Sequence, residues 1–247
     1  MLETRNLSKS FGALTVADRI SFRLEAGARH ALIGPNGAGK TTFVNMLTGA
    51  LAPSSGSILL GGEDVTRVAQ AKRVKRGIGR TFQINSLFRS LSVLDNVALA
   101  VAERTGVAGR MWKAASRHEE IIAECRDLLN SLSLLEDAAK RISDLPYGKQ
   151  RLVEIAIALG MRPRVLLLDE PAAGVPSHES HRILEVLAAL PADIAILIIE
   201  HDMDLVFRFA KRITVLAAGA VLMHGTPQEV AADRRVREVY LGEAKHG

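Results

Sequence analysis

Residues 30–42 read HALIGPNGAGKTT, and from Gly34 onward they fit the pattern G-x-x-x-x-G-K-[ST]. The apolar run HALI before the pattern is typical of a buried strand, and the run FVNMLTGAL after it is typical of a helix. Glycines let a backbone wrap closely around phosphate groups, so that N–H groups and the start of the helix point at negative charge. The stretch therefore predicts a phosphate-binding loop between a strand and a helix.

Two side chains of this loop carry specific chemistry. Lys40 is expected to reach the β- and γ-phosphates of a nucleotide, and the Thr41 hydroxyl is expected to bind Mg²⁺. The other nucleotide-binding residues predicted in the loop are Gly34, Pro35, Asn36, Gly37, Ala38, Gly39 and Thr42. A chance glycine turn is the alternative, and it is disfavoured because the strand, the Lys-Thr pair and the helix stand in register.

The second motif is an apolar run that ends in two carboxylates, Val165-Leu-Leu-Leu-Asp-Glu-Pro171. Asp169 suits the Mg²⁺ shell, and Glu170 suits a general base that polarises an attacking water. The alternative is an ordinary strand ending in a solvated acidic turn, which a phosphate loop in the same chain disfavours. Together the two motifs allow several classes of phosphate-loop protein.

Some of these classes require motifs of their own. A GTPase carries an N-K-x-D motif that reads guanine, and no lysine of this chain is preceded by Asn and followed two places on by Asp. A small-molecule kinase needs neither a glutamate beside the metal-binding aspartate nor the stretch DLPYGKQ at residues 144–150. These two features therefore require a different class.

The distribution of apolar residues predicts an α/β fold. Three runs, His30–Ile33, Val165–Leu168 and Ile194–Ile199, are typical of buried parallel strands, whose carboxyl ends are expected to line a ligand crevice. Between Gln83 and Asp144 the apolar spacing becomes helical, which predicts a helical insertion. The stretches Ser57–Leu60 and Ile213–Met223 are expected to be antiparallel strands beside the main sheet.

Composition and charge set further limits. The 247 residues are 48% hydrophobic, no apolar run reaches the roughly 18 residues of a membrane-spanning helix, and the N-terminus lacks signal-peptide features, so we expect a cytoplasmic protein. The lone cysteine, Cys125, is expected to be a small buried residue. The net charge is +5, and residues 65–94 carry a basic run without one acid: Arg67, Lys72, Arg73, Lys75, Arg76, Arg80 and Arg89. We favour a solvated helix face or a partner contact over nucleic-acid binding, because charge runs alone are unspecific.

Five motifs taken together resemble an ATP-binding cassette (ABC) ATPase over essentially the whole chain. These motifs, in chain order, are GPNGAGKTT, RTFQ ending in Gln83, LPYGKQ, LLLDEP and IIEHD containing His201. The resemblance implies a P-loop NTPase core with a mixed sheet, an antiparallel β subdomain and a helical subdomain. It implies a single domain, 1–247, in which the helical subdomain 84–160 is inserted in a RecA-like core formed by 1–83 and 161–247.

The resemblance also implies roles for particular residues. Phe11 would stack on adenine with Val16 as its apolar companion. The alternative is a core phenylalanine, and only the place of Phe11 ahead of the phosphate-loop strand favours stacking. The implied catalytic residues are Glu170 as the base, His201 as the γ-phosphate contact and Gln83 beside the attacking water; the implied metal ligands are Thr41, Gln83 and Asp169. The alternatives are a surface amide for Gln83 and metal clusters built on His201 with Glu200 and Asp202 or on His178 with His181; we favour solvated histidines, because neither group has further ligands at recognised spacing.

The stretch LPYGKQ stands where the family carries its Leu-Ser-Gly-Gly-Gln signature, which faces the ATP of a partner subunit. The predicted signature loop comprises Leu145, Pro146, Tyr147, Gly148, Lys149 and Gln150. Pro146 removes both a hydroxyl and a backbone N–H, so we hypothesise that Gly148 and the start of the following helix, from Lys149 onward, hold the phosphate with fewer contacts. Because each motif occurs once, the resemblance implies a two-fold dimer, with itself or with a similar cassette. Pro176 stands where the family has Asp or Asn, which leaves coupling between the two sites open.

Within the family the chain most resembles the branched-chain (hydrophobic) amino-acid importer group. The supporting stretches are the tyrosine before Gly148, DEPAAG, IEHDMDLV, and HGTPQEV followed by VYLGE. The resemblance implies ATP and Mg²⁺ as cofactors, two membrane permease subunits gripped near Phe82–Asn96, and a substrate-binding protein outside the cell. The chain would then lie on the inner face of the membrane and power solute uptake. One alternative is a soluble ABC ATPase acting on nucleic acid or the ribosome. Another is a regulatory ATP-binding module, which the candidate catalytic residues Glu170 and His201 disfavour.

Overall fold

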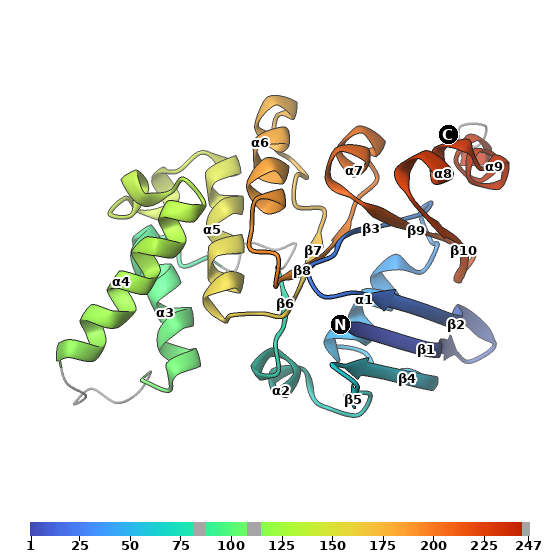
Figure 1. Cartoon of the computed structure of the whole chain (residues 1–247), viewed down its shortest axis with the longest axis horizontal. Helices are drawn as coiled ribbons and strands as arrows, with labels where there is room; N and C mark the ends of the chain where they lie inside the picture. The colour runs from blue at the N-terminus through green and yellow to red at the C-terminus, as the bar shows by residue number, and fades with distance from the viewer. Residues whose placement is uncertain (82–86, 108–114, 244–247) are drawn as a thin grey trace.

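The computed structural model describes residues 1–81, 87–107 and 115–243, and its main sheet carries the phosphate-loop strand at its centre (Figure 1). In the described chain this sheet has the order β10-β9-β3-β8-β7-β6. Its strands are β3 (Arg29–Ile33), β6 (Ile78–Arg80), β7 (Val165–Asp169), β8 (Ala195–Ile199), β9 (Arg212–Ala217) and β10 (Ala220–Gly225). Strands β3, β7 and β8 are buried along their whole length, as expected for parallel strands covered on both faces.

The three predicted parallel strands are confirmed, since β3 pairs with β8 and β8 with β7 in parallel. The prediction of antiparallel strands in Ile213–Met223 is confirmed, since β9 and β10 pair antiparallel, but their expected place beside the main sheet was wrong, because both belong to this sheet and β9 is parallel to β3. Among the described strands of the main sheet, β10 alone is antiparallel to its neighbour. Ala218 and Gly219, with φ of 47° and 80°, form the tight turn that reverses the chain between them.

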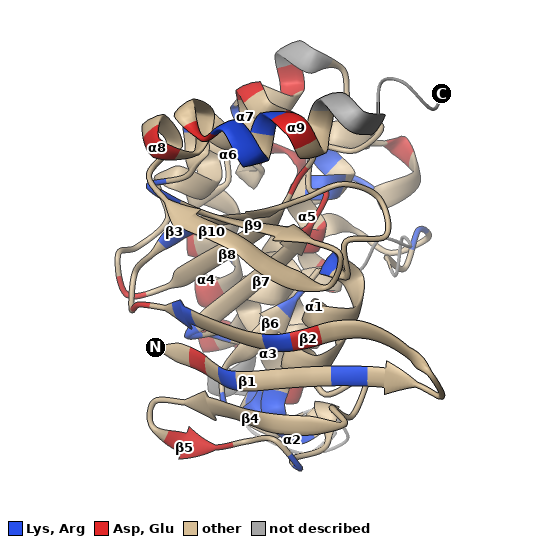
Figure 2. Cartoon of the chain, turned by 90° about the vertical axis from the view of Figure 1, so that its right-hand side faces the viewer, with Lys and Arg blue, Asp and Glu red and all other residues tan. Residues whose placement is uncertain are grey.

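A second, antiparallel sheet lies beside the first, in the order β2-β1-β4-β5 (Figure 2). Its strands are β1 (Leu2–Phe11), β2 (Leu14–Leu24), β4 (Ser55–Leu60) and β5 (Glu63–Asp64). The prediction for Ser57–Leu60 is confirmed, whereas β1 and β2 were not foreseen. Register shifts between Thr4 and Leu7 and positive φ angles at Asn6 and Arg19 interrupt the alternation by which strands are recognised in a sequence.

Helix α1 (Lys40–Thr48) buries Phe43, Val44 and Met46 in a core that also takes in residues of both sheets. A separate core contains the other face of the main sheet together with α6 (Ser177–Ala188) and α7 (Met203–Phe209). The remaining short helices are α2 (Gln70–Lys75), α8 (Pro227–Ala232) and α9 (Arg234–Glu243). No helix in the described residues combines the length and the apolarity that a membrane span requires.

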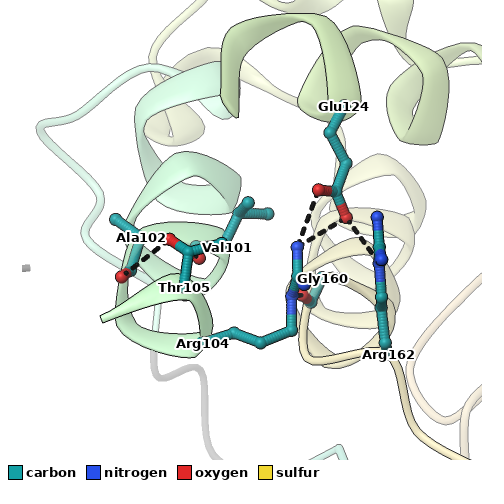
Figure 3. Close-up of polar contacts among 7 residues, drawn as sticks. All are labelled: Val101, Ala102, Arg104, Thr105, Glu124, Gly160 and Arg162. Atoms are coloured by element: carbon teal, nitrogen blue, oxygen red, sulfur yellow. Dashed lines mark hydrogen bonds and ion pairs between the residues drawn. The ribbon is translucent and has the colours of Figure 1, made fainter. Parts of the chain in front are cut away.

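Helices α3 (Val93–Thr105), α4 (Ala115–Ser131) and α5 (Tyr147–Gly160) form a group at one end of the molecule (Figure 1). The 3₁₀ turns η1 (Leu135–Asp137) and η2 (Ile142–Asp144) lie between α4 and α5 in the chain. Arg104 of α3 fastens this group (Figure 3): its Nε donates to the Gly160 carbonyl at 2.8 Å, and its Nη2 donates to both Glu124 carboxylate oxygens at 2.7 Å. Arg162 donates to the same carboxylate at 3.0 Å. The helical spacing predicted between Gln83 and Asp144 is thus confirmed for the described residues.

Cys125 of α4 is fully buried in the core between these helices, as predicted. Burial raises the pKa of its thiol to about 11. The thiolate that a nucleophile or a metal ligand requires is therefore strongly disfavoured, and Cys125 acts as an apolar residue.

The basic run 65–94 is only partly solvated, so the hypothesis of a solvated face was wrong for two of its arginines. Arg73 is 1% exposed. Its guanidinium donates to the carbonyls of Met46, Leu47, Thr66 and Val68 at 2.7–2.8 Å. Arg80 is likewise used inside the chain, as described below. The Met46 and Leu47 carbonyls lie in the last turn of α1, where a helix leaves carbonyl groups without internal partners. Arg73 therefore acts as a buried cap of this helix.

Replacing Arg73 by methionine is expected to destabilise the protein by about 3–5 kcal/mol, because several buried carbonyls lose their donors at once. The free energy of unfolding in urea, measured for the Arg73→Met and wild-type proteins, checks this value. Lys72→Met on the exposed face of the same helix is the matched control and should change stability little. Equal stabilities for Arg73→Met and Lys72→Met would contradict the assignment.

His30 of β3 gives the protein a pH-dependent stability. Its Nε2 lies 2.7 Å from the Thr214 hydroxyl, its ring meets Phe22 edge-on, and only 6% of the residue is exposed. Burial, with smaller contributions from His224 and Arg212, lowers the pKa of His30 to about 3. Below about pH 6.5 the unfolded chain binds a proton at this histidine that the folded chain does not, so stability falls as the pH is lowered toward 3.

The free energy of unfolding of the wild-type protein is therefore expected to fall by up to about 1.4 kcal/mol per pH unit from this group between roughly pH 6 and 4. Urea unfolding at pH 7, 6 and 5 measures the slope, and a His30→Gln variant should show a shallower one. His181→Gln on α6 serves as the control for losing a histidine elsewhere. A slope unchanged by His30→Gln would contradict this account.

Candidate nucleotide site

The loop after β3 has the shape that the motif predicts. Gly34, Gly37 and Gly39 all have positive φ angles, of 152°, 76° and 93°. A Cβ atom would lie 2.2 Å from the Leu216 carbonyl oxygen at Gly34, and 2.6 Å from the Val16 carbonyl oxygen at Gly39. The loop is therefore pressed against β9 and β2, and only glycine fits at these two positions. Helix α1 begins at Lys40 without a side-chain cap, so the start of the helix is open to a phosphate.

Lys40 lies across this loop. Its Nζ donates to the carbonyl oxygens of Gly34 and Pro35 at 2.5 and 2.8 Å. The amine is thereby held over the loop whose N–H groups would cradle phosphates. Thr41 is exposed and Thr42 partly buried at the start of the helix, where a hydroxyl can reach a metal ion beside the phosphates. Pro35, Asn36, Gly37 and Ala38 complete the loop between the strand and the helix.

Asp169 ends strand β7 and is fixed by an arginine. Its Oδ2 accepts from Arg80 Nη2 at 2.9 Å, and Arg80 Nη1 donates to Asn45 Oδ1 of α1 at 2.7 Å. The carboxylate is 5% exposed and is thus tied to the helix that follows the phosphate loop. A hydroxyl at Thr41 and a carboxylate at Asp169 are hard oxygen donors, which fit Mg²⁺ because this ion takes one or two protein ligands and fills its shell with water and phosphate oxygens.

Glu170 occupies a strained position directly after Asp169. Its φ is 46°, a conformation that costs about 1–3 kcal/mol for a residue with a side chain. Its N–H donates to the Ile199 carbonyl at 2.9 Å, which holds the backbone to the end of β8. The side chain is 36% exposed, so it has access to water. Strained backbone at a polar, accessible group is typical of catalytic positions.

His201 lies beside Glu170 at the end of the neighbouring strand. Its Nδ1 is 3.6 Å from Glu170 Oε1 and 3.6 Å from Glu200 Oε2, and its side chain is 68% exposed. Glu200 is buried and accepts the backbone N–H groups of His201 and Asp202 at 3.0 and 3.4 Å. Burial raises the pKa of Glu200. Glu200 therefore shapes the turn that presents His201, and in the described residues no three His, Cys, Asp or Glu side chains gather as a metal cluster.

Two predicted nucleotide contacts, Phe11 and Val16, lie at the end of β1 and near the start of β2. Phe11 is 53% exposed, which excludes the alternative that it belongs to the core. Lys9 Nζ lies 5.1 Å from the centre of its ring. The carbonyl of Val16 faces Gly39 of the phosphate loop, which places this strand next to the site. Gln83, in contrast, lies outside the described residues.

The signature loop begins α5, which starts at Tyr147 and not, as expected, at Lys149. Pro146 occupies the N-cap with φ of −55°, where its missing N–H has no bond to lose. Leu145 is buried, and its carbonyl accepts from Gln150 Nε2 at 2.9 Å, while Lys149 Nζ donates to Asp137 at 2.6 Å. These side chains hold the loop to its own chain. The carboxylate of Glu179 lies against the start of the helix, since a Cβ atom at Gly148 would be 2.2 Å from its Oε2, so a phosphate that binds there has to displace this side chain.

Sequence reasoning missed Arg80, Asn45 and Glu200. Arg80 was one of seven basic residues in the run, and nothing in its spacing marked it as the partner of Asp169. Glu200 was considered only as a possible metal ligand in a cluster with His201 and Asp202. Its burial and its bonds to the following backbone are tertiary features without a sequence signal.

The arrangement as a whole defines a class of protein: a phosphate-loop nucleotide-binding domain with an acidic strand end and a histidine beside a candidate base. Comparison with known proteins narrows it. A family profile for the ABC transporter matches residues 17–173, and one for the branched-chain amino acid ATP-binding cassette transporter matches residues 220–246. The chain belongs to the ABC transporter family.

Full-length relatives agree with this assignment. The chain is 36% identical to the high-affinity branched-chain amino acid transport ATP-binding protein BraF of Pseudomonas aeruginosa, with 99% of this chain and 98% of that protein covered. It is 37% identical to LivG of Escherichia coli, a protein of the same description, with the same coverage. The crystal structure of the ADP conformation of an ATP-binding cassette of an ABC transporter is 30% identical, with a TM-score of 0.85 and 98% of each chain covered. The predicted fold class is thereby confirmed.

Proposed function

We propose that this chain is the ATP-binding and ATP-hydrolysing subunit of an importer that takes up branched-chain amino acids or a related small solute through partner permeases. The observation that carries the proposal is the placement of Glu170 on a strained backbone beside His201 and directly after Asp169, which α1 and Arg80 tie to the phosphate loop. The amino-acid class is supported by the names of the relatives and by the profile that matches residues 220–246.

The residues of the phosphate loop and its neighbours bind ATP and Mg²⁺. Lys40 exchanges its two carbonyl acceptors for the β- and γ-phosphates of ATP. Hydrogen bonds from the ammonium to charged phosphate oxygens are stronger than those to neutral carbonyls. Phe11 stacks on adenine, with Val16 as its apolar neighbour, and the loop glycines bring backbone N–H groups to the phosphates. Mg²⁺ held by Thr41, Asp169 and Gln83 would offset the charge that develops on the phosphates.

Glu170 takes the proton of the attacking water, since its carboxylate is the accessible acid at the strand end. His201 contacts the γ-phosphate, and its proximity to Glu170 keeps the imidazole oriented. The N–H of Glu170 fixes its backbone to Ile199, so the base approaches water from a constant direction. Positioning of this kind supplies most of the catalysis of phosphoryl transfer.

A two-fold dimer of cassettes, identical or similar, completes the site. One chain supplies a single phosphate loop and a single signature loop, Leu145–Gln150, so each site takes its halves from both subunits. Gly148 at the start of α5 would meet the γ-phosphate of the partner's ATP. ATP then joins the halves and hydrolysis releases them, which provides the mechanical stroke.

The helical group α3–α5, within the proposed subdomain 84–160, would grip the permease on the inner face of the membrane. Phe88 and Leu91, which precede α3, and Leu99 of α3 are 59%, 37% and 48% exposed, and such exposed apolar side chains are available to a partner. The first two fall within the predicted contact Phe82–Asn96, of which 82–86 lie outside the described residues. A substrate-binding protein outside the cell would act indirectly, through the permeases.

A nucleic-acid function receives less support. Arg73 and Arg80, which contribute to the basic run, are bonded inside the chain, and Lys75 and Arg76 lie 3.6 and 2.9 Å from the carboxylates of Glu103 and Glu63. The run therefore offers few free charges to a phosphate backbone.

The test is to purify the chain together with the permeases and to measure ATP hydrolysis with and without a substrate-binding protein loaded with leucine, isoleucine or valine. Co-isolation and a several-fold stimulation by loaded binding protein are expected. Hydrolysis stimulated by RNA or ribosomes, without permease association, would instead support the soluble alternative.

A further inference from the structure

Tyr147, which replaces the first glycine of the family's signature, packs against the loop that follows the candidate base. A Cβ atom on Gly174 would lie 3.2 Å from Cε1 of the Tyr147 ring and 3.6 Å from its hydroxyl oxygen. Gly174 has φ of 75°, so the chain turns there with its open face toward the ring. The contact joins the first residue of α5 to the segment that runs from Glu170 to Pro176.

The same ring also contacts Arg151. The guanidinium carbon of this residue lies 5.0 Å from the ring centre, within the range of a cation–π interaction. Arg151 is 7% exposed and donates to Glu154 Oε2 at 2.8 Å. Glu154 in turn lines a cavity of about 170 Å³ together with Arg80, the partner of Asp169. Tyr147 is 37% exposed, and its ring lies between a buried ion pair of α5 and the backbone of the loop after Glu170.

We propose that Tyr147 is a positioning residue which couples, within one chain, the signature loop to the candidate base Glu170. The inference rests on the proposed function, in which the signature loop serves the partner's nucleotide and Glu170 serves the chain's own nucleotide. A glycine at residue 147, as in the usual signature, has no side chain to span the distance to Gly174. The coupling is therefore a property of the tyrosine variant.

The strained backbone at Glu170 explains why the contact between Tyr147 and Gly174 affects the direction of the Glu170 carboxylate. Glu170 holds a φ of 46°, and its N–H is fixed to Ile199, so its carboxylate direction depends on the backbone on its other side. That backbone leads to Gly174, which carries the contact with Tyr147. When ATP of the partner draws the signature loop into place, the ring settles Gly174 and with it the base of the other site. Binding at one site then promotes hydrolysis at the other.

Mixed dimers separate this effect from a direct contact with nucleotide. Two differently tagged chains are co-purified, one of which carries Glu170→Gln, so that both sites bind ATP but only the site with the intact Glu170 hydrolyses it. In the first arm, Tyr147→Ala is placed in the chain with the intact Glu170, on which it can act within that chain. In the second arm, Tyr147→Ala is placed in the Glu170→Gln chain, whose signature loop faces the nucleotide that is hydrolysed.

In the first arm kcat is expected to fall about fivefold with an unchanged KM for ATP, the size expected for losing a cation–π and packing contact. The second arm should retain kcat to within about twofold, with any loss appearing in KM. A fall in kcat that is equal or larger in the second arm overturns the proposal, as does an unchanged kcat in the first. Absence of turnover in the mixed dimer without a Tyr147 substitution would overturn the proposed function itself.

Two further variants guard against misfolding. Tyr147→Phe keeps the ring and should restore most of the turnover in the first arm, whereas failure of this rescue overturns the role of the ring. Leu135→Ala removes a similarly exposed apolar side chain from the same helical group and is expected to leave both arms unchanged.

Discussion

Glu170→Gln is expected to lower ATP turnover by about a thousandfold and to trap an ATP-bound dimer. The expected size follows from general-base catalysis, because glutamine keeps the shape of the side chain but cannot accept the proton of the attacking water. The phosphate loop, Lys40 and the signature loop are untouched, so ATP still binds and joins the two subunits. Steady-state phosphate release measures turnover, and light scattering with ATP and Mg²⁺ measures the mass of the complex.

Glu185→Gln is the matched control, since it removes a carboxylate from the exposed face of α6 without touching the site. Turnover of this variant should equal that of the wild type. If Glu170→Gln hydrolysed ATP at the wild-type rate, Glu170 would not be the base.

Gly148→Asp is expected to abolish ATP-driven dimerisation while leaving the binding of ATP to the isolated subunit intact. A Cβ atom at Gly148 would lie 2.2 Å from Oε2 of Glu179, so an aspartate adds both bulk and a second negative charge beside this carboxylate. The added charge stands at the start of α5, where the partner's phosphate should bind. Losing one charge-assisted bond of about 1.5–3 kcal/mol weakens association roughly 10- to 100-fold, and repulsion weakens it further.

The ATP concentration at half-maximal dimerisation, measured in the Glu170→Gln background, gives this effect directly. Gly148→Ala is the control for bulk alone: the Glu179 side chain is flexible at its end and can move, so a smaller loss is expected. Unchanged dimerisation of the Gly148→Asp protein would show that the proline-bearing signature loop does not bind the partner's nucleotide.

The parts of the fold that could be predicted are those in which a local pattern determines the structure. The buried runs around Ala31, Leu167 and Ile198 became parallel strands because only strands covered on both faces tolerate unbroken apolar sequence. The phosphate loop was predictable for the same reason, since the φ angles at Gly34 and Gly39 require glycine. Strands β1 and β2 were not, because their register shifts and polar residues break the alternation.

The parts of the site that escaped prediction depend on contacts between distant residues. Arg73 and Arg80 belong to one basic run, yet both leave the solvent to bond groups of α1, and the helix that receives them precedes the run in the chain. The contact of Tyr147 with Gly174 joins two motifs that the sequence presents as independent. Pro176, the residue that left coupling between the sites open, is the N-cap of α6 and follows this contact by two residues. Such pairings follow from tertiary packing, which no spacing within a single motif encodes.

The most direct test of the account is uptake of labelled branched-chain amino acid into proteoliposomes that contain the permeases with this chain, in the presence of a substrate-binding protein and ATP. We expect ATP-dependent accumulation with the wild-type chain, and none with Glu170→Gln even though that variant binds ATP and dimerises. Equal accumulation with both chains, or vigorous ATP hydrolysis by the assembled complex without uptake of any branched-chain amino acid or related solute, would contradict it.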